Sequence, residues 1–379
     1  MTTTESPRRA ATTPAPAPET PAASPARGGE PGSAKRMFSG MALIVGMLVA
    51  LVVFILISAS SGQLSIPVGE VASGFLQGIG IDVGGAASHP QAYNTLWSVR
   101  FPRVAMAAAV GAALAIGGVL MQGAFGNPLA EPSVVGVSSG AAVGAAAAIV
   151  FGLTAFGSWT QVVCAFVAGV ATTAAVYLFS RSNGRTEVVT LVLTGIAINA
   201  VAGALLAFLM FIGDTQAREE IVFWQMGSLA GSRWEQVVIV APIAIIGILL
   251  SMRLARSLDI LSLGERSARH LGVDVERLRI FSILLVGLLT AAAVSFVGIV
   301  AFVGLVVPHL IRMMIGPGHR MLIPASVVGG ALVLTAADLF ARTAVAYADL
   351  PLGMITALVG GPFFFWLLRR TRRTAGGWG

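Results

Sequence analysis

Long apolar segments separated by short polar ones dominate this chain. Beyond residue 36, apolar runs close to the roughly 20 residues that a helix needs to cross a bilayer recur almost to the C-terminus. We interpret the least regular interval, 280–315, as two segments joined by a tight turn near Ser295–Gly298, rather than as one long helix with a re-entrant piece. The pattern predicts an all-α polytopic membrane protein with about ten transmembrane helices, at residues 37–59, 98–120, 133–152, 160–180, 188–212, 237–255, 280–296, 298–315, 322–341 and 352–369.

The two ends of the chain differ from its apolar middle. Residues 1–36 contain seven of the 18 prolines among Ala, Thr, Ser and charged residues, a composition that cannot bury a core. We therefore expect a disordered tail over 1–36, a ten-helix membrane domain over 37–371 and a short C-terminal tail over 372–379. Between the first two spans, residues 66–71 look like the start of a short amphipathic helix on the outer surface.

Composition excludes an ordinary soluble protein. The chain is 56% hydrophobic and only 11% charged, with a mean hydropathy of +0.86, whereas soluble proteins carry about 25% charged residues. So few polar residues cannot cover a soluble particle of 379 residues. A polytopic helical membrane protein is the class that fits.

Positive charges mark one side of the predicted membrane domain. The connections that an even number of spans places on the side of the N-terminus hold Arg181 and Arg185, six arginines between residues 253 and 279, Arg312 with Arg320, and four arginines between 369 and 373. By the positive-inside rule, this side and both termini are cytoplasmic. The formal net charge of +7 then follows from topology, and we expect no nucleic-acid partner.

The residues needed for catalysis or metal binding are scarce. The one cysteine, Cys164, excludes an intrachain disulfide and a cysteine-cluster metal site. The one lysine, Lys35, lies in the N-terminal tail, so no P-loop can form in the membrane domain. None of the four histidines forms the H-E-x-x-H pattern. We therefore expect no catalytic residue, no metal site and no cofactor bound by this chain, which is not expected to be an enzyme.

The stretch from Arg100 to Gly144 is the most distinctive part of the sequence. It begins with R-F-P-R and continues as a helix of small residues, which lets helix backbones approach closely in a membrane. That helix ends at Gln122, and the motif N-P-L-A-E-P, from Asn127 to Pro132, then turns the chain. Any membrane helix hairpin would explain the composition, but not this order of motifs.

Three further motifs follow. G-E-R-S-A-R-H-L-G occupies residues 264–272, F-V-G-L-V-V-P-H-L-I-R occupies 302–312, and A-D-L-F-A-R occupies 337–342. Together with the first stretch, they resemble the permease subunits of type II ABC importers for iron siderophores, haem and cobalamin, the FecCD-type family. The resemblance covers about residues 40–370.

The resemblance implies a partner set and a mechanism. Two permease subunits, with a homodimer preferred, would enclose a pathway that opens to each side of the bacterial plasma (inner) membrane in turn. Two separate ATPase subunits would bind ATP and Mg²⁺, and an extracytoplasmic binding protein would deliver the substrate. We expect an iron chelate, with haem ahead of ferric siderophore because the run F-W-Q-M-G-S-L at 223–229 looks more like haem permeases. Cobalamin is the alternative.

The resemblance also assigns roles to residues. It places a coupling helix, which docks on the ATPase, at about 262–273, with Gly264, Glu265, Ala268, Arg269, Leu271 and Gly272 as its key residues. Without the resemblance, the same amphipathic pattern would suit a surface helix with no partner. The resemblance also implies that Arg100, Arg103 and Arg342 dock the binding protein. The alternative is that these arginines snorkel to lipid headgroups. By the same resemblance, Val188 and Val189 are candidates for a hydrophobic gate on the cytoplasmic side.

The remaining motif residues are expected to be structural: Gln122, Asn127, Pro128, Pro308, His309 and Asp338. Asp338 lies four residues before Arg342 on the same helix face, so we expect it to pair with a cation. The alternative is an ion-coupled secondary transporter in which Asp338 binds the coupling ion. His309 as a haem or metal ligand is less favoured. One position departs from many relatives, which carry Arg or Gln where this chain has Gly126.

Overall fold

The computed structural model of the chain describes residues 2, 32–81, 89–182, 185–345 and 347–374. The tail predicted to be disordered lies outside the described residues except for residue 2 and residues 32–36, and so does the end of the chain beyond residue 374. Residues 32–36 belong to the first helix, which therefore starts inside the segment expected to be tail.

The described chain is almost entirely helical. Its helices are α1 (Gly32–Ser60), α2 (Val68–Gly78), α3 (Ala92–Thr95), η1 (Leu96–Arg100), α4 (Phe101–Phe125), η2 (Pro132–Val135), α5 (Val137–Val150), η3 (Gly157–Trp159), α6 (Thr160–Phe179), α7 (Val188–Ile212), α8 (Thr215–Met226), α9 (Trp234–Leu261), α10 (Glu265–His270), α11 (Val275–Val297), α12 (Val303–Ile315), α13 (His319–Thr343) and α14 (Leu352–Thr374). Two short antiparallel strands, β1 (Arg181–Ser182) and β2 (Arg185–Thr186), lie between α6 and α7.

Among the described residues, seven helical stretches are long and apolar enough to cross a membrane. They comprise the Phe38–Ser60 part of α1 and the helices α4, α6, α7, α9, α11 and α13, and each coincides with one predicted span. The other three predicted spans fall on shorter apolar helices, α5, α12 and the Leu352–Trp366 part of α14. The chain is thus an all-α, multi-pass membrane protein.

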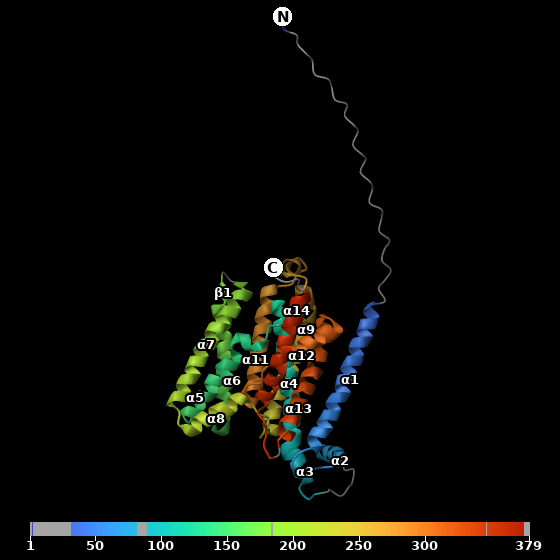
Figure 1. Cartoon of the computed structure of the whole chain (residues 1–379), viewed down its shortest axis with the longest axis vertical. Helices are drawn as coiled ribbons and strands as arrows, with labels where there is room; N and C mark the ends of the chain where they lie inside the picture. The colour runs from blue at the N-terminus through green and yellow to red at the C-terminus, as the bar shows by residue number, and fades with distance from the viewer. Residues whose placement is uncertain (1, 3–31, 82–88, 183–184, 346, 375–379) are drawn as a thin grey trace.

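The bundle has a buried centre and two exposed flanks (Figure 1). In the most apolar part of α4, 83% of the residues are buried within the protein, and in that of α11, 72%. The corresponding share is 6% for α1 and 17% for α7, which stand at opposite edges of the bundle. Apolar side chains on these outer helices suit contact with lipid or with another subunit.

The two ends of the bundle also differ (Figure 1). The start of α1, the end of α14 and strand β1 lie at one end, which we call the hairpin end. Helices α2 and α3 lie at the other, which we call the α2–α3 end. Because the start of α1 and the end of α14 are at the same end, the chain crosses the bundle an even number of times.

Small residues let the central helix contact its neighbours through backbone atoms. A Cβ built on Gly118 of α4 would lie 1.7 Å from the carbonyl oxygen of Gly304 on α12, and one on Gly111 would lie 2.2 Å from that of Gly330 on α13. No side chain fits at these positions. The Gly and Ala content of α4 therefore sets the distance between the central helices.

The connection between α11 and α12 is longer than the predicted tight turn. Helix α11 ends at Val297, and α12 begins only at Val303. Phe302, the residue before α12, has φ +66°, a left-handed conformation that costs free energy for a bulky residue. Its backbone N–H donates to Glu131 Oε1 at 3.2 Å, so a carboxylate from the Asn127–Pro132 turn holds this break.

Helix α8 was not predicted as a separate element. Its first half contains Arg218, Glu219 and Glu220, so it carries no continuous apolar run. The side chain of Asp214 caps it by accepting the N–H of Ala217 at 2.7 Å. After α8, Ser228 N–H donates to Val297 O at 2.7 Å, which attaches this segment to the end of α11.

We predict that Gly118→Ala destabilises the protein by about 1–3 kcal/mol, because one methyl group would overlap the Gly304 carbonyl and force α4 and α12 apart. Thermal unfolding in detergent checks this. The matched control is Gly203→Ala on α7, where a Cβ meets nothing within 4 Å and helix propensity should leave stability equal or slightly higher. Equal melting temperatures for the two variants would contradict the packing argument.

Candidate functional site

Helix α10 protrudes at the hairpin end of the bundle between two glycines. Gly264 has φ +103° and Gly272 has φ +81°, conformations that L-residues with a side chain rarely adopt. Ala268 is fully buried and attaches the helix to the bundle, whereas Leu271 is 61% exposed. Ala268 thus packs against the bundle, while Leu271, the residue that ends the helix, remains exposed. The glycines are needed because the chain turns sharply at both ends of a six-residue helix.

A cavity of about 710 Å³ lies beside α10. Its walls come from α10, from the first turn of α11 and from the start of α7. Glu265 and Arg269 line it together with Val188 and Val189, the residues predicted from separate motifs as coupling and gate residues. Helix α7 begins at Val188, and Val189 is 71% exposed. The fold thus brings the two predicted sites to one cavity.

Polar contacts in this cavity involve residues that the motifs did not single out. Glu276 accepts both the N–H of Thr186, at 3.0 Å, and its hydroxyl, at 2.6 Å. Arg279 donates to Thr186 O at 3.3 Å, and it forms an ion pair with Glu265. Glu265 also binds Arg269 at 3.2 Å, one helical turn away. In the sequence, Arg279 was visible only as one of several cytoplasmic positive charges.

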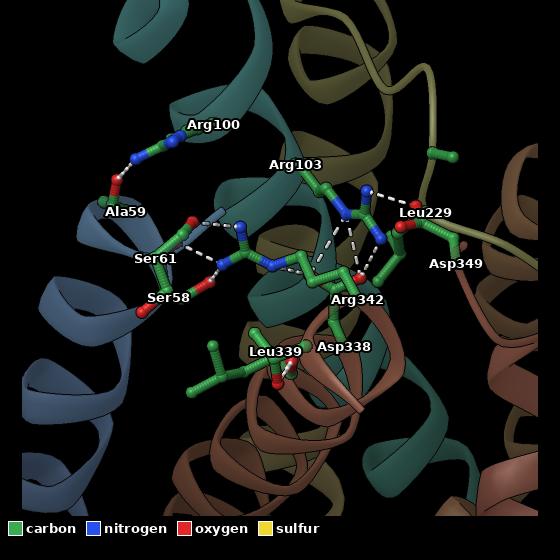
Figure 2. A network of polar contacts seen from close by, with 12 residues as sticks. Ser58, Ala59, Ser61, Arg100, Arg103, Leu229, Asp338, Leu339, Arg342 and Asp349 are labelled. Carbon is green, nitrogen blue, oxygen red and sulfur yellow. Dashed lines mark hydrogen bonds and ion pairs between the residues drawn. The ribbon is translucent and has the colours of Figure 1, made fainter. Parts of the chain in front are cut away.

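At the α2–α3 end, a second polar cluster joins α4 to α13 (Figure 2). Arg103 Nε and Nη2 each lie 2.9 Å from Asp338 Oδ1, and Nη1 lies 2.8 Å from Asp349 Oδ2. The Asp338 side chain is only 2% exposed. A buried carboxylate needs a cation and hydrogen bonds, and Arg103 supplies both. Sequence proximity pointed to Arg342 as the partner of Asp338, but the closer partner is Arg103.

The other two arginines of this cluster fasten the end of α1 (Figure 2). Arg342 donates to Ser61 O at 2.9 Å and to Ser58 O, while its Nε lies 3.7 Å from Asp338 Oδ2. Arg100 donates to three backbone carbonyls at and beyond the end of α1, those of Ala59, Ser60 and Leu64. These contacts supply donors to carbonyls that a helix end leaves without partners.

We call Arg100, Arg103, Asp338, Arg342 and Asp349 the arginine clasp. Its three arginines are largely buried: Arg100 is 6% exposed, and the side chains of Arg103 and Arg342 are 13% and 9% exposed. The reason is that backbone carbonyls of α1 and two carboxylates already occupy their donors. With three arginines and two aspartates, the clasp keeps a formal surplus of one positive charge. Docking of a partner there stays a prediction.

Side chains attach the end of α4 and the turn after it to α12. His309 Nδ1–H donates to Pro128 O at 3.3 Å, and Asn127 Oδ1 accepts the N–H of Leu129 at 2.9 Å within the turn. Gln122, 2% exposed, donates through Nε2 to Leu305 O at 3.2 Å. Irregular backbone at membrane depth is tolerated only where the protein or a watery cavity provides partners. His309 and Asn127 provide them for the backbone of the turn.

Pro308 lies inside α12 and has no N–H, so it cannot donate the helical hydrogen bond to the carbonyl of Gly304, four residues earlier. That carbonyl faces Gly118 of α4 at the close approach described above. Among the described residues, no group of three or more His, Cys, Asp or Glu side chains lies close enough together to hold a metal ion. His309 is used in the contact between α12 and the turn.

Comparisons with known proteins agree with this architecture. The model of the FecCD transport family matches residues 50–370. The hemin transport system permease protein HmuU of Yersinia pestis is 40% identical over 286 residues, which are 74% of this chain and 85% of that protein. The cobalamin import system permease protein BtuC of Halobacterium salinarum is 40% identical over 278 residues, 72% of each chain.

A solved structure shows the same fold. It is described as a metal-chelate type ABC transporter in an inward-facing conformation, and it superposes with a TM-score of 0.76. It is 34% identical, and the match covers 87% of this chain and 99% of that one. The family expected from the motifs is confirmed over nearly the whole membrane domain: the chain belongs to the FecCD transport family, as a permease subunit of an ABC importer rather than an enzyme.

Proposed function

We propose that this chain is the membrane-spanning subunit of an ATP-driven importer for an iron chelate, with haem preferred over a ferric siderophore. The observation that carries the importer mechanism is the cavity in which α10 meets the start of α7. Support for an iron chelate comes from the similarity to a hemin permease and to a metal-chelate transporter. The equally high identity to a cobalamin permease makes cobalamin the second candidate.

The proposed topology has ten spans with both termini in the cytoplasm of a bacterium, in its plasma membrane. The hairpin end is then cytoplasmic and the α2–α3 end faces outward. Support comes from the arginines that cluster at the hairpin end and from the common position of the start of α1 and the end of α14 (Figure 1). Positive charge on the cytoplasmic side is the usual arrangement.

The proposed assembly contains two copies of this chain, two ATPase subunits and an extracytoplasmic binding protein. The exposed apolar faces of α7 and α14 are available for lipid or for the second copy. ATP and Mg²⁺ belong to the ATPase subunits, and no cofactor is assigned to this chain. We do not propose an ion-coupled transporter, because Asp338 is held by Arg103 and because similar proteins are permeases of import systems.

In this proposal, α10 docks on the ATPase through exposed side chains. Leu263 is 66% exposed and Leu271 is 61% exposed, and the charged Glu265 and Arg269 lie beside them. An apolar pair flanked by charges suits a groove on a partner protein. ATP-driven closure of the ATPase pair would move α10, and with it the cavity wall that includes Val188 and Val189.

The first experiment is purification of the complex from native membranes in mild detergent, with identification of bound proteins and an ATPase assay. We expect a stoichiometric ATPase subunit and a binding protein that stimulates it. Uptake of haem, a ferric siderophore and cobalamin into vesicles that contain ATP then ranks the substrates. Uptake of cobalamin alone would overturn the iron-chelate assignment, and the absence of any ATPase would overturn the mechanism.

We predict that the double variant Glu265→Ala, Arg269→Ala uncouples ATP hydrolysis from transport, because it removes charged groups that link α10 to the docking surface and the cavity. ATP-dependent uptake should fall by about tenfold or more, as expected for loss of a charge-assisted contact, while the protein still folds. The control is Arg320→Ala, a change at the same end of the bundle. Normal uptake by the double variant would refute the coupling role.

We also predict that Arg103→Gln weakens binding of the loaded binding protein by about tenfold, the effect of losing one hydrogen bond to a charged group. Asp349, with a side chain 40% exposed, is the clasp carboxylate that a partner's carboxylate can replace most easily. Asp349→Asn should therefore keep or increase affinity. Titration of the complex with labelled binding protein measures both, with the exposed Arg233→Gln as the control. Equal affinities in all variants would exclude the clasp as the docking site.

A further inference from the structure

Arg279 is a buried cation that contacts three separate segments. It lies near the start of α11 and is 6% exposed. Its Nε donates to Ala124 O in the last turn of α4 at 3.4 Å, its Nη1 donates to Thr186 O at 3.3 Å, and its Nη2 is paired with Glu265 at the start of α10. No two of these acceptors belong to the same helix or strand. One guanidinium therefore joins α4, β2 and α10.

The contact with Thr186 leads directly to the start of α7. Thr186 is 2% exposed, and its N–H and hydroxyl are both held by Glu276, one turn before Arg279 on α11. All the polar groups of this residue are thus bound by α11. Only Glu187 separates Thr186 from Val188. The first turn of α7 therefore has little freedom to move unless Glu276 and Arg279 move with it.

The contact with Ala124 links Arg279 to the turn that follows α4. The last carbonyls of a helix have no partner within it, and an arginine can supply one. Ala124 lies three residues before Asn127, where the turn along α12 begins. The same guanidinium therefore fixes both the end of α4 and the residue that precedes α7.

We propose that Arg279 is the positioning residue that transmits movement of α10 to the start of α7 and to the end of α4. The inference rests on the proposed importer function and identifies how its cavity would respond to the ATPase. Only the Glu265 contact lies on a partly exposed side chain, 44% exposed, whereas the Ala124 and Thr186 carbonyls are buried with Arg279. A displacement of α10 therefore reaches the interior through this ion pair.

The geometry of the guanidinium matters for this role. Arginine presents five donors in a rigid planar fork, so that its three contacts cannot move independently. Lysine carries the same charge as a compact point on a flexible stem and would keep the attraction to Glu265 without holding both carbonyls in place. Arg277 provides the matched control, because it is on the same turn of α11 and its side chain is 88% exposed and paired with Asp274.

The test uses the complete complex with its ATPase subunits in lipid nanodiscs. The chain carries Cys164→Ala, which removes its one cysteine, and Val189→Cys as a reporter at the exposed start of α7. A membrane-impermeant maleimide reacts with the reporter in the nucleotide-free state and after trapping with ATP and vanadate. The ratio of the two labelling rates measures how strongly the nucleotide state of the ATPase changes the accessibility of the start of α7.

In this parent chain we expect the two rates to differ by about fivefold or more, as in other coupled pairs of sites. With Arg279→Gln the ratio should approach one while ATP hydrolysis continues, with Arg279→Lys it should be intermediate, and with Arg277→Gln it should equal that of the parent. A purely structural role would lower protein yield or thermal stability but would leave the ratio of the assembled complex unchanged.

An unchanged ratio in assembled Arg279→Gln complex would overturn the inference while leaving the importer function in place. If that variant does not assemble, the Arg279→Lys variant decides, since it keeps the buried charge: a ratio equal to the parent's would overturn the inference, and a reduced ratio would support it. A parent complex that shows no response to ATP and vanadate would overturn the proposed function, and this inference with it.

Discussion

Polar groups at membrane depth must find their partners within the protein, because hydrocarbon offers none. Most of the chain meets this constraint by being helical. Where the helices are interrupted, specific side chains provide the partners: Glu131 for the backbone N–H of Phe302 and His309 for the carbonyl of Pro128. Gln122 adds a contact from α4 to the carbonyl of Leu305 in α12. The interruptions are thus fixed by side chains from neighbouring elements, and each of these contacts joins the α4–α5 segment to α12 or to the residue before it.

Close packing around α4 makes these contacts possible. Gly111 and Gly118 let the backbones of α13 and α12 approach α4 so closely that no side chain fits between them. Lipid gives no hydrophobic drive for helices to associate, so packing of this kind carries much of the stability. It also places the side chains of Gln122 and Glu131 within reach of backbone groups on α12 and before it.

Charged residues are used differently at the two ends of the bundle. At the α2–α3 end, the arginine clasp binds carbonyls and carboxylates of its own chain and so fastens α1, α4 and α13 together (Figure 2). At the hairpin end, Arg279 holds three segments, but one of its partners, Glu265, stands on a small protruding helix. In the role proposed above, a displacement of α10 is transmitted inward through Glu265 and Arg279, whereas the contacts of the clasp hold α1, α4 and α13 together.

Hydropathy in the sequence determined the all-helical membrane class and the positions of the apolar helices, because a bilayer imposes the length and the apolar character of each helix. Local motifs also determined that α7 begins at Val188 and that α10 lies between two glycines. The tertiary structure alone decided which charges far apart in the sequence pair. Arg103 and Asp338 are 235 positions apart, and Arg279 reaches partners 14, 93 and 155 positions away. Such pairings depend on which helices become neighbours, and that is set by the packing of small residues along whole helices, so the sequence near either partner does not reveal them.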